Sequence, residues 1–207
     1  MQSNIKLSQQ QQDQWLEARQ HFGETGIGVV NMGESHGYFY LVSMADGFYQ
    51  NPKFALTSPR LEGDTFSIPS ESHQVFSQAS YNWLPVLEEA LSDAQCSQAS
   101  FIDIGAFVGA VPLRVVSTKG PIAWSTSSFE PNPENVLLTK LNFTLNEATQ
   151  SVVHQLAVTN SAGEASFSIP ENYSISGRVL KDGQNAFTNT FTVKTVDINT
   201  VIESADG

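Results

Sequence analysis

Apolar and polar positions in the second half of the chain predict strands and helices in alternation. Short apolar runs at residues 100–104, 122–129 and 151–158 are typical of buried strands. Between them, residues 107–118 and 133–146 repeat apolar positions at helical spacing. Strand–helix–strand alternation of this kind predicts right-handed crossovers and a parallel sheet covered by helices on both faces.

Capping residues sharpen the limits of the two predicted helices. Asn132 is a typical N-cap residue, and Pro133 suits the first helical position, where its missing N–H group has no partner to lose. Pro112 is compatible with a helix only near its first turn, so the preceding helix must begin shortly before it.

The first half of the chain is patterned less regularly. Residues 9–22 predict a short polar helix, and residues 37–44 have the aromatic and β-branched enrichment of a strand. Residues 52–72 contain several turn formers and predict a loop-rich hairpin segment. Residues 70–94 predict an amphipathic helix that Pro85 kinks or divides.

Composition narrows the class of protein. The 207 residues, 40% of them hydrophobic, can bury one sizeable core, and the net charge of -11 with scattered basic residues argues against a nucleic-acid partner. No apolar stretch is long enough to span a membrane and the start lacks a signal peptide, so a cytoplasmic protein is expected. Cys96 is the single cysteine, and neither a disulfide nor a metal site is expected.

Acidic residues and glycines mark the ends of two successive predicted strands. Asp103 and Gly105 end the first strand, Gly109 follows shortly after, and Glu130 ends the second. Ligands of open α/β sheets bind beyond the carboxyl ends of the strands, so these residues are expected to line one crevice. Glycines allow close approach of a ligand to the backbone, and an acid ending the second strand can accept both hydrogen bonds of a ribose diol.

The glycine loop differs from that of a dinucleotide site. Phe107 and Ala110 stand where two glycines of the GxGxxG pattern would fall, and no basic residue accompanies the two acids. This combination favours a cofactor without phosphate groups.

Four motifs in order resemble one known family. The chain from about residue 70 to 203 is similar to the S-adenosylmethionine-dependent methyltransferases of the FkbM type. The resemblance is carried by DIGAFVG, FEPNPEN, HQLAVTNSAGEASFSIPEN and FTVKTVDINTVI. It implies a Rossmann-like α/β methyltransferase fold with three α/β/α layers, incomplete at the C-terminus. A segment of residues 1–69 would precede the methyltransferase part, residues 70–207.

The family resemblance also implies an activity and a site. It implies transfer of a methyl group from S-adenosylmethionine to a hydroxyl of a small-molecule or glycan acceptor, often on a sugar or natural product. Glu130 would bind the ribose hydroxyls, and Asp103 would lie at the methionine end. The implied cofactor-binding residues are Asp103, Gly105, Ala106, Phe107, Gly109, Glu130, Pro131, Asn132 and Ala157.

The sequence departs from the family pattern in three places. Phe107 replaces the usual asparagine of the glycine loop, so packing would replace a polar contact there. Asn160 stands in the loop where the family has an acid. The sequence ends at Gly207, before the segment that supplies the fourth strand, so the first strand is expected to be a sheet edge that can pair with another chain, and the chain alone a poor catalyst.

Two other classes of protein remain open. A nucleotide-binding oxidoreductase also carries an acid at a strand end but needs a fuller glycine motif. A non-catalytic remnant or interaction module would have its incomplete sheet completed by a partner. The sequence identifies neither the acceptor nor a catalytic base; His73 is a candidate base, Arg178 a candidate contact for a substrate anion, and His154 a packing residue within the third strand.

Overall fold

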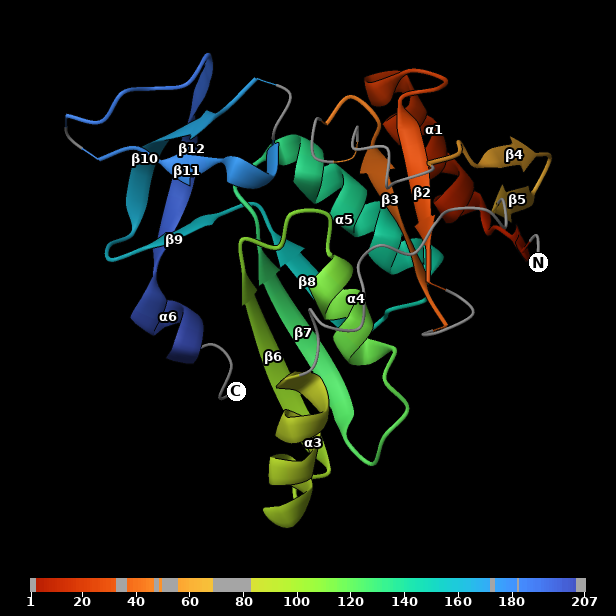
Figure 1. Ribbon diagram of the computed structural model, residues 1–207, viewed down its shortest axis with the longest axis horizontal. Helices are drawn as coiled ribbons and strands as arrows, with labels where there is room; N and C mark the ends of the chain where they lie inside the picture. The colour runs from red at the N-terminus through yellow and green to blue at the C-terminus, as the bar shows by residue number, and fades with distance from the viewer. Residues whose placement is uncertain are drawn as a thin grey trace.

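The computed structural model describes residues 3–32, 37–46, 49, 56–68, 83–171, 174–181 and 183–203. In this part the chain is mixed α/β, with one parallel sheet and several antiparallel pairings (Figure 1). The helices are α1 (Gln9–Phe22), α3 (Trp83–Asp93), α4 (Ala110–Val116), α5 (Pro133–Leu145), the 3-10 helix η2 (Ser174–Ser176) and α6 (Ile198–Glu203).

The strands belong to four sheets, each described here by its strand order. Two are at the N-terminal side: β1 (Ser3–Lys6), β5 (Thr65–Ile68) and β4 (Arg60–Glu62), and the hairpin β2 (Ile27–Asn31) with β3 (Phe39–Ser43). The third is β6 (Gln98–Ile104), β7 (Ala123–Phe129) and β8 (Ser151–His154). The fourth is β11 (Arg178–Val179), β10 (Gly163–Ile169), β12 (Asn189–Asp197) and β9 (Ala157–Thr159).

Some N-terminal elements agree with the sequence predictions, whereas strands β1 and β2 were not predicted. Helix α1 has the predicted limits and begins with a capping box, in which Ser8 and Gln11 satisfy each other's backbone N–H groups. Strand β3 lies inside the predicted strand 37–44, and β4 with β5 forms a hairpin inside the predicted segment 52–72.

Strands β6, β7 and β8 form the predicted parallel sheet. Their register pairs Ile104 with Phe129, and Phe129 with His154, so the three strands end side by side. Helix α4 connects the first two strands and α5 the second two, as the alternating pattern predicts. In the described part of the chain β7 is the one partner of β6, which makes β6 an edge of this sheet.

Helices cover one face of the parallel sheet, whereas the sequence predicted helices on both. Leu84 of α3 and Val115 of α4 pack on the face that carries Trp124. On the opposite face Ile104 is 51% and Val152 53% exposed, and no described helix packs there. The strands follow one another in chain order, so right-handed connections place both crossover helices on the same face.

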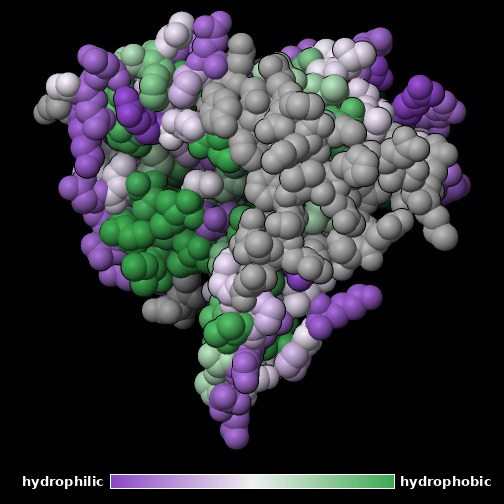
Figure 2. Space-filling view, viewed as in Figure 1, coloured by the Kyte–Doolittle hydropathy of each residue, from purple (hydrophilic) through white to green (hydrophobic). Residues whose placement is uncertain are grey.

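The predicted third strand is divided between two sheets. Strand β8 ends at His154, and after Gln155 and Leu156 the chain enters β9, which pairs in parallel with β12. Ala157 therefore begins a strand of the fourth sheet and is buried with Phe167 and Val193, so it does not extend the third strand of the parallel sheet as predicted. Figure 2 shows hydrophobic residues at the surface over α6, at the end of this fourth sheet.

One hydrophobic core joins the N-terminal elements to the parallel sheet. Trp15 of α1, Leu41 of β3 and Phe66 of β5 are buried in the same cluster as Leu113 of α4 and Leu141 of α5. The expected domain boundary between residues 69 and 70 stays a prediction. Residues from both of the expected parts, 1–69 and 70–207, contribute to this core.

Helix α4 is shorter than the helix predicted over residues 107–118. Helix α4 begins at Ala110 and not at residue 107, because Phe107 and Gly109 have positive φ angles, which a right-handed helix does not contain. Pro112 and Pro85 each lie in the first turn of their helices, as required. The N-terminal part of the predicted helix 70–94 lies outside the described residues.

No helix in the described ranges combines the length and the apolar character that crossing a membrane would require.

Candidate functional site at the ends of the parallel strands

The loop from β6 to α4 is anchored to the end of the neighbouring strand. The N–H groups of Gly105 and Ala106 donate to the carbonyl of Phe129, at 2.8 and 3.2 Å. The N–H of Glu130 donates in turn to the carbonyl of His154 at 3.0 Å. The glycine loop and Glu130 thus lie together at the carboxyl edge of the sheet, where the sequence places them.

Glu130 connects this loop to the start of α5. Its Oε2 accepts a hydrogen bond from the Phe107 N–H at 2.9 Å. Its Oε1 accepts from the Asn132 N–H at 2.9 Å and from Nδ2 of Asn135 at 3.3 Å. Burial, at 5% exposure, raises the pKa of Glu130 to about 7. The three hydrogen-bond donors lower this pKa, and the charge of the nearby Asp103 raises it. A carboxylate has about four acceptor positions, so roughly one remains for a ligand.

Helix α5 holds the loop from its other side. The Thr139 hydroxyl donates to the carbonyl of Phe107 at 2.8 Å, and Nδ2 of Asn142 donates to the carbonyl of Val108 at 2.8 Å. Together with Glu130, these side chains bind consecutive peptide groups of the loop. The loop is therefore held in one conformation by the protein itself.

Gly105 and Gly109 of the loop differ in the space around their Cα atoms. Both have positive φ, +83° at Gly105 and +77° at Gly109. A Cβ at Gly109 would lie 2.8 Å from Cγ2 of Thr139, whereas a Cβ at Gly105 would meet no atom of the described residues within 4 Å. Gly109 thus allows α5 to pack closely, and Gly105 borders open space that a ligand can approach.

Phe107 contributes a ring contact in place of the expected polar one. Its ring stacks on that of Tyr49, with centroids 5.9 Å apart and planes 8° from parallel. Its φ of +53° lies in the left-handed region, which asparagine adopts more readily than phenylalanine. Packing against Tyr49 favours this position of the ring, in line with the expectation that Phe107 contributes packing and not a polar contact.

Asp103 has an unsatisfied oxygen beside this site. Its Oδ2 is buried and has no hydrogen-bond partner among the described residues. Desolvation raises the pKa of Asp103 to about 6. A buried acceptor without a partner is a group that a ligand's N–H or O–H can satisfy.

Asp103→Asn is expected to stabilise the protein at alkaline pH. Because the pKa of Asp103 is raised in the folded state, burial of its charge lowers the stability of the wild type. This loss of stability is absent below the ordinary pKa of 3.8 and complete above about pH 6. The variant should exceed the wild type by on the order of 2 kcal/mol at pH 8 and match it near pH 4, in urea unfolding at both pH values. The exposed Asp93→Asn controls for the loss of one charge. If the difference in the free energy of unfolding between Asp103→Asn and the wild type does not change with pH, the raised pKa of Asp103 would be contradicted.

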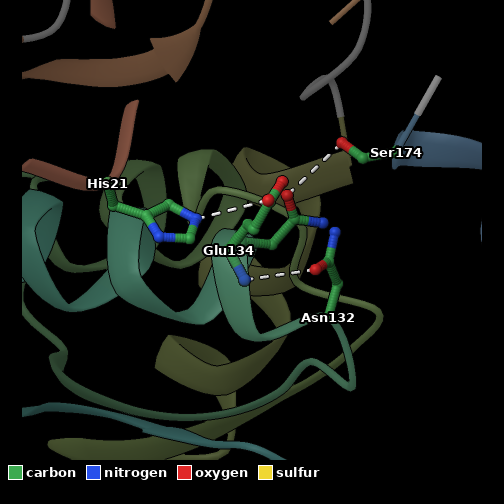
Figure 3. Close-up of polar contacts among 5 residues, drawn as sticks. His21, Asn132, Glu134 and Ser174 are labelled. Atoms are coloured by element: carbon green, nitrogen blue, oxygen red, sulfur yellow. Dashed lines mark hydrogen bonds and ion pairs between the residues drawn. The ribbon is translucent and has the colours of Figure 1, made fainter. Parts of the chain in front are cut away.

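The described cavity nearest to these residues lies beside the strand ends and not over them. It has a volume of about 290 Å³ and is lined by Asn132 and Asn135, the residues that hold Glu130, together with Asp46 and Ser174. Asp46 and Ser174 come from segments far apart in the chain. Neither belongs to a sequence motif, so the sequence did not indicate that they lie together. Asn132 caps α5 through the Glu134 N–H, as predicted (Figure 3).

The remaining predicted residues have local partners. His154 stacks on Phe129 with centroids 4.8 Å apart and contacts the Ser127 hydroxyl at 3.1 Å, in agreement with its prediction as a packing residue. It is, however, the last residue of β8 and lies at the carboxyl edge, not inside the strand as predicted. The Arg178 guanidinium donates to the carbonyl of Asn185 at 3.2 Å and lies over the ring of Phe187, within its own loop. His73 lies outside the described residues.

No protein-family model and no curated protein matches the sequence. In the described ranges no group of three or more His, Cys, Asp or Glu side chains could hold a metal ion.

Proposed function

We propose that the carboxyl edge of β6 and β7 binds S-adenosylmethionine and that the protein transfers its methyl group to a hydroxyl of a small-molecule or glycan acceptor. The observation that carries the proposal is the placement of Gly105 at the same strand edge as two carboxyls. An added Cβ at Gly105 would meet no described atom within 4 Å, Glu130 is buried, and Asp103 has a buried Oδ2. The Rossmann-like methyltransferase fold belongs to the same proposal, supported by the parallel order β6-β7-β8.

The residues present fit such a cofactor. The unsatisfied Oδ2 of Asp103 can accept a hydrogen bond from a cationic amine, and Gly105 permits close approach. Glu130 can accept one ribose hydroxyl at its remaining position and a second by releasing Asn135, its longest contact at 3.3 Å. The cofactor would supply an electrophilic methyl group on a sulfonium. The protein's contribution would be to align the acceptor with it, which demands little of any one side chain.

Calorimetric titration with S-adenosylhomocysteine tests the proposal. We expect binding in the micromolar range and at least a tenfold loss in Glu130→Gln, equivalent to about 1.4 kcal/mol. Glu147→Gln, an exposed position at the far end of α5, is the matched control. Thermal unfolding of each variant separates loss of binding from loss of the fold.

A parallel titration with NADH separates this function from that of an oxidoreductase. Binding of NADH in place of S-adenosylhomocysteine would refute the methyltransferase proposal, as would the absence of heat from a folded protein.

A further inference from the structure

Two carboxyl groups lie together at the carboxyl edge of β6 and β7, and neither has a cationic partner among the described residues. The hydrogen-bond donors of Glu130 are neutral, two backbone N–H groups and the amide of Asn135. Oδ2 of Asp103 is buried and has no donor in the described part of the chain. The charge of Asp103 raises the pKa of Glu130, so the two groups act on each other. Such a pair keeps a proton at a pH where a single exposed carboxyl is ionised.

The nearby charged groups of α5 and of the turn after β3 do not neutralise this pair. Glu134 is itself an acid, and its Oε1 lies 3.2 Å from Nε2 of His21, which it holds at its own side chain (Figure 3). Asp46 is a further acid, hydrogen-bonded to Ser174. These elements therefore bring negative charge toward the strand ends, and the one basic group that accompanies them is engaged elsewhere.

The basic groups of β8 and α4 do not compensate the pair either. His154 is paired with Phe129, the residue that follows the cross-strand partner of Asp103. Successive residues of a strand face opposite sides of a sheet, so the side chains of His154 and Asp103 lie on different faces. Arg114 of α4 forms no ion pair with another described residue. The pair thus lacks a positive neighbour within the described ranges.

A proton and a ligand compete for the same positions on these oxygens. A carboxylate has about four acceptor positions, and three of those on Glu130 are occupied by N–H donors. A ribose hydroxyl that donates to Glu130 therefore needs the position that a proton would occupy. An ammonium group at Oδ2 of Asp103 likewise supplies the cation that the buried carboxylate lacks. Both contacts favour the ionised form of the pair.

We propose that a cofactor entering this edge displaces a proton held by Asp103 and Glu130, so that its affinity falls as the solution becomes acidic. The inference rests on the proposed function, because the competing donors are the ammonium group and the ribose hydroxyls of S-adenosylmethionine. The proton passes to the solvent, and no other bond is made or broken.

The sign and the pH range follow from the raised pKa values, about 6 for Asp103 and about 7 for Glu130. Above about pH 8 both groups of the free protein are ionised, so binding has no proton to displace. As the pH falls through these values both groups become protonated, and each proton must be removed before the ligand can bind. Affinity is therefore complete at about pH 8 and is lost progressively toward about pH 6 and below.

Calorimetric titration of the full chain with S-adenosylhomocysteine across this range tests the inference. We expect an affinity about tenfold or more higher at about pH 8 than at about pH 6. At about pH 6.5, titrations in phosphate and in imidazole, which differ in their heats of ionisation, should reveal release of about one proton for each ligand bound. Near pH 8 the two buffers used should give nearly equal heats.

Carboxyl NMR of the free protein provides a readout that needs no ligand. Asp103→Asn and Glu130→Gln assign the two resonances, which should titrate with raised pKa values and move toward the ordinary range, about 4, in the saturated complex. Asp103→Asn should also release less proton on binding than the wild type. Glu147→Gln, at an exposed position, should keep the full pH dependence and is the matched control.

The outcomes separate this inference from the proposed function. Binding of S-adenosylhomocysteine with the same affinity at both pH values and equal heats in both buffers would overturn the inference alone. Tighter binding at acidic pH would do the same, as would carboxyl groups of the free protein that titrate near about 4. Absence of binding at every pH from a folded protein would refute the proposed function and this inference with it.

Discussion

Asn142→Leu is expected to lower the free energy of unfolding by about 3 kcal/mol or more. Oδ1 of the wild-type residue accepts from the Leu41 N–H at 2.6 Å, and Nδ2 donates to the carbonyls of Leu41 at 3.1 Å and Val108 at 2.8 Å. Leucine would leave these backbone groups buried without partners, at roughly 1 to 3 kcal/mol for each. Because small domains are stable by only about 5 to 15 kcal/mol, much of the margin would be lost.

Urea unfolding of Asn142→Leu should be compared with Lys140→Leu, an exposed position on the same helix. Asn146→Leu is an informative intermediate. Its amide makes the equivalent pair of bonds to Phe39, but the side chain is half-buried, so water can replace part of what is lost. A loss below about 1 kcal/mol in Asn142→Leu would show that β3 is not held by this amide.

Gly109→Ala is expected to destabilise the protein by about 3 kcal/mol, whereas Gly105→Ala should cost about half as much. Each alanine would have to keep a positive φ, at roughly 1 to 2 kcal/mol. At Gly109 the new Cβ would also press on Thr139 and Phe143, which adds roughly 1 to 3 kcal/mol of overpacking. Gly105 has no such neighbours.

The two glycine variants should separate stability from binding. Titration with S-adenosylhomocysteine is expected to show that Gly105→Ala weakens binding more than Gly109→Ala does, when both are measured well below their unfolding temperatures. Equal destabilisation of the two variants would contradict the close packing of α5 against Gly109. The comparison requires no knowledge of the acceptor.

Two asparagines at the C-terminal end of α5 connect the β2–β3 hairpin to the candidate site by hydrogen bonds. Asn142 and Asn146 lie four residues apart, on one face of the helix, and their amides pair with Leu41 and Phe39, two residues apart on β3. Each amide provides one donor and one acceptor, as a backbone peptide does, so the helix satisfies a strand edge. Through Asn142 the same helix also binds the glycine loop at the carbonyl of Val108.

The sequence alone determined several of the local elements and the parallel pairing of the strands between residues 100 and 154. Strand–helix alternation and the Asn132-Pro133 start of α5 depend on periodicity and capping, which act over a few residues. The placing of Asp103, Gly105 and Glu130 at one edge followed as well, because parallel strands joined by short crossovers end together.

Only the tertiary structure decided which groups satisfy one another across long separations. The contact of Asp46 with Ser174, that of Asn142 with Leu41 and the stacking of Phe107 on Tyr49 join segments that no local pattern relates. The division of the third strand between two sheets likewise depends on pairing of β9 with β12, far along the chain. Local propensity is a short-range property, whereas burial of a polar group is tolerated only where the whole fold supplies its partner.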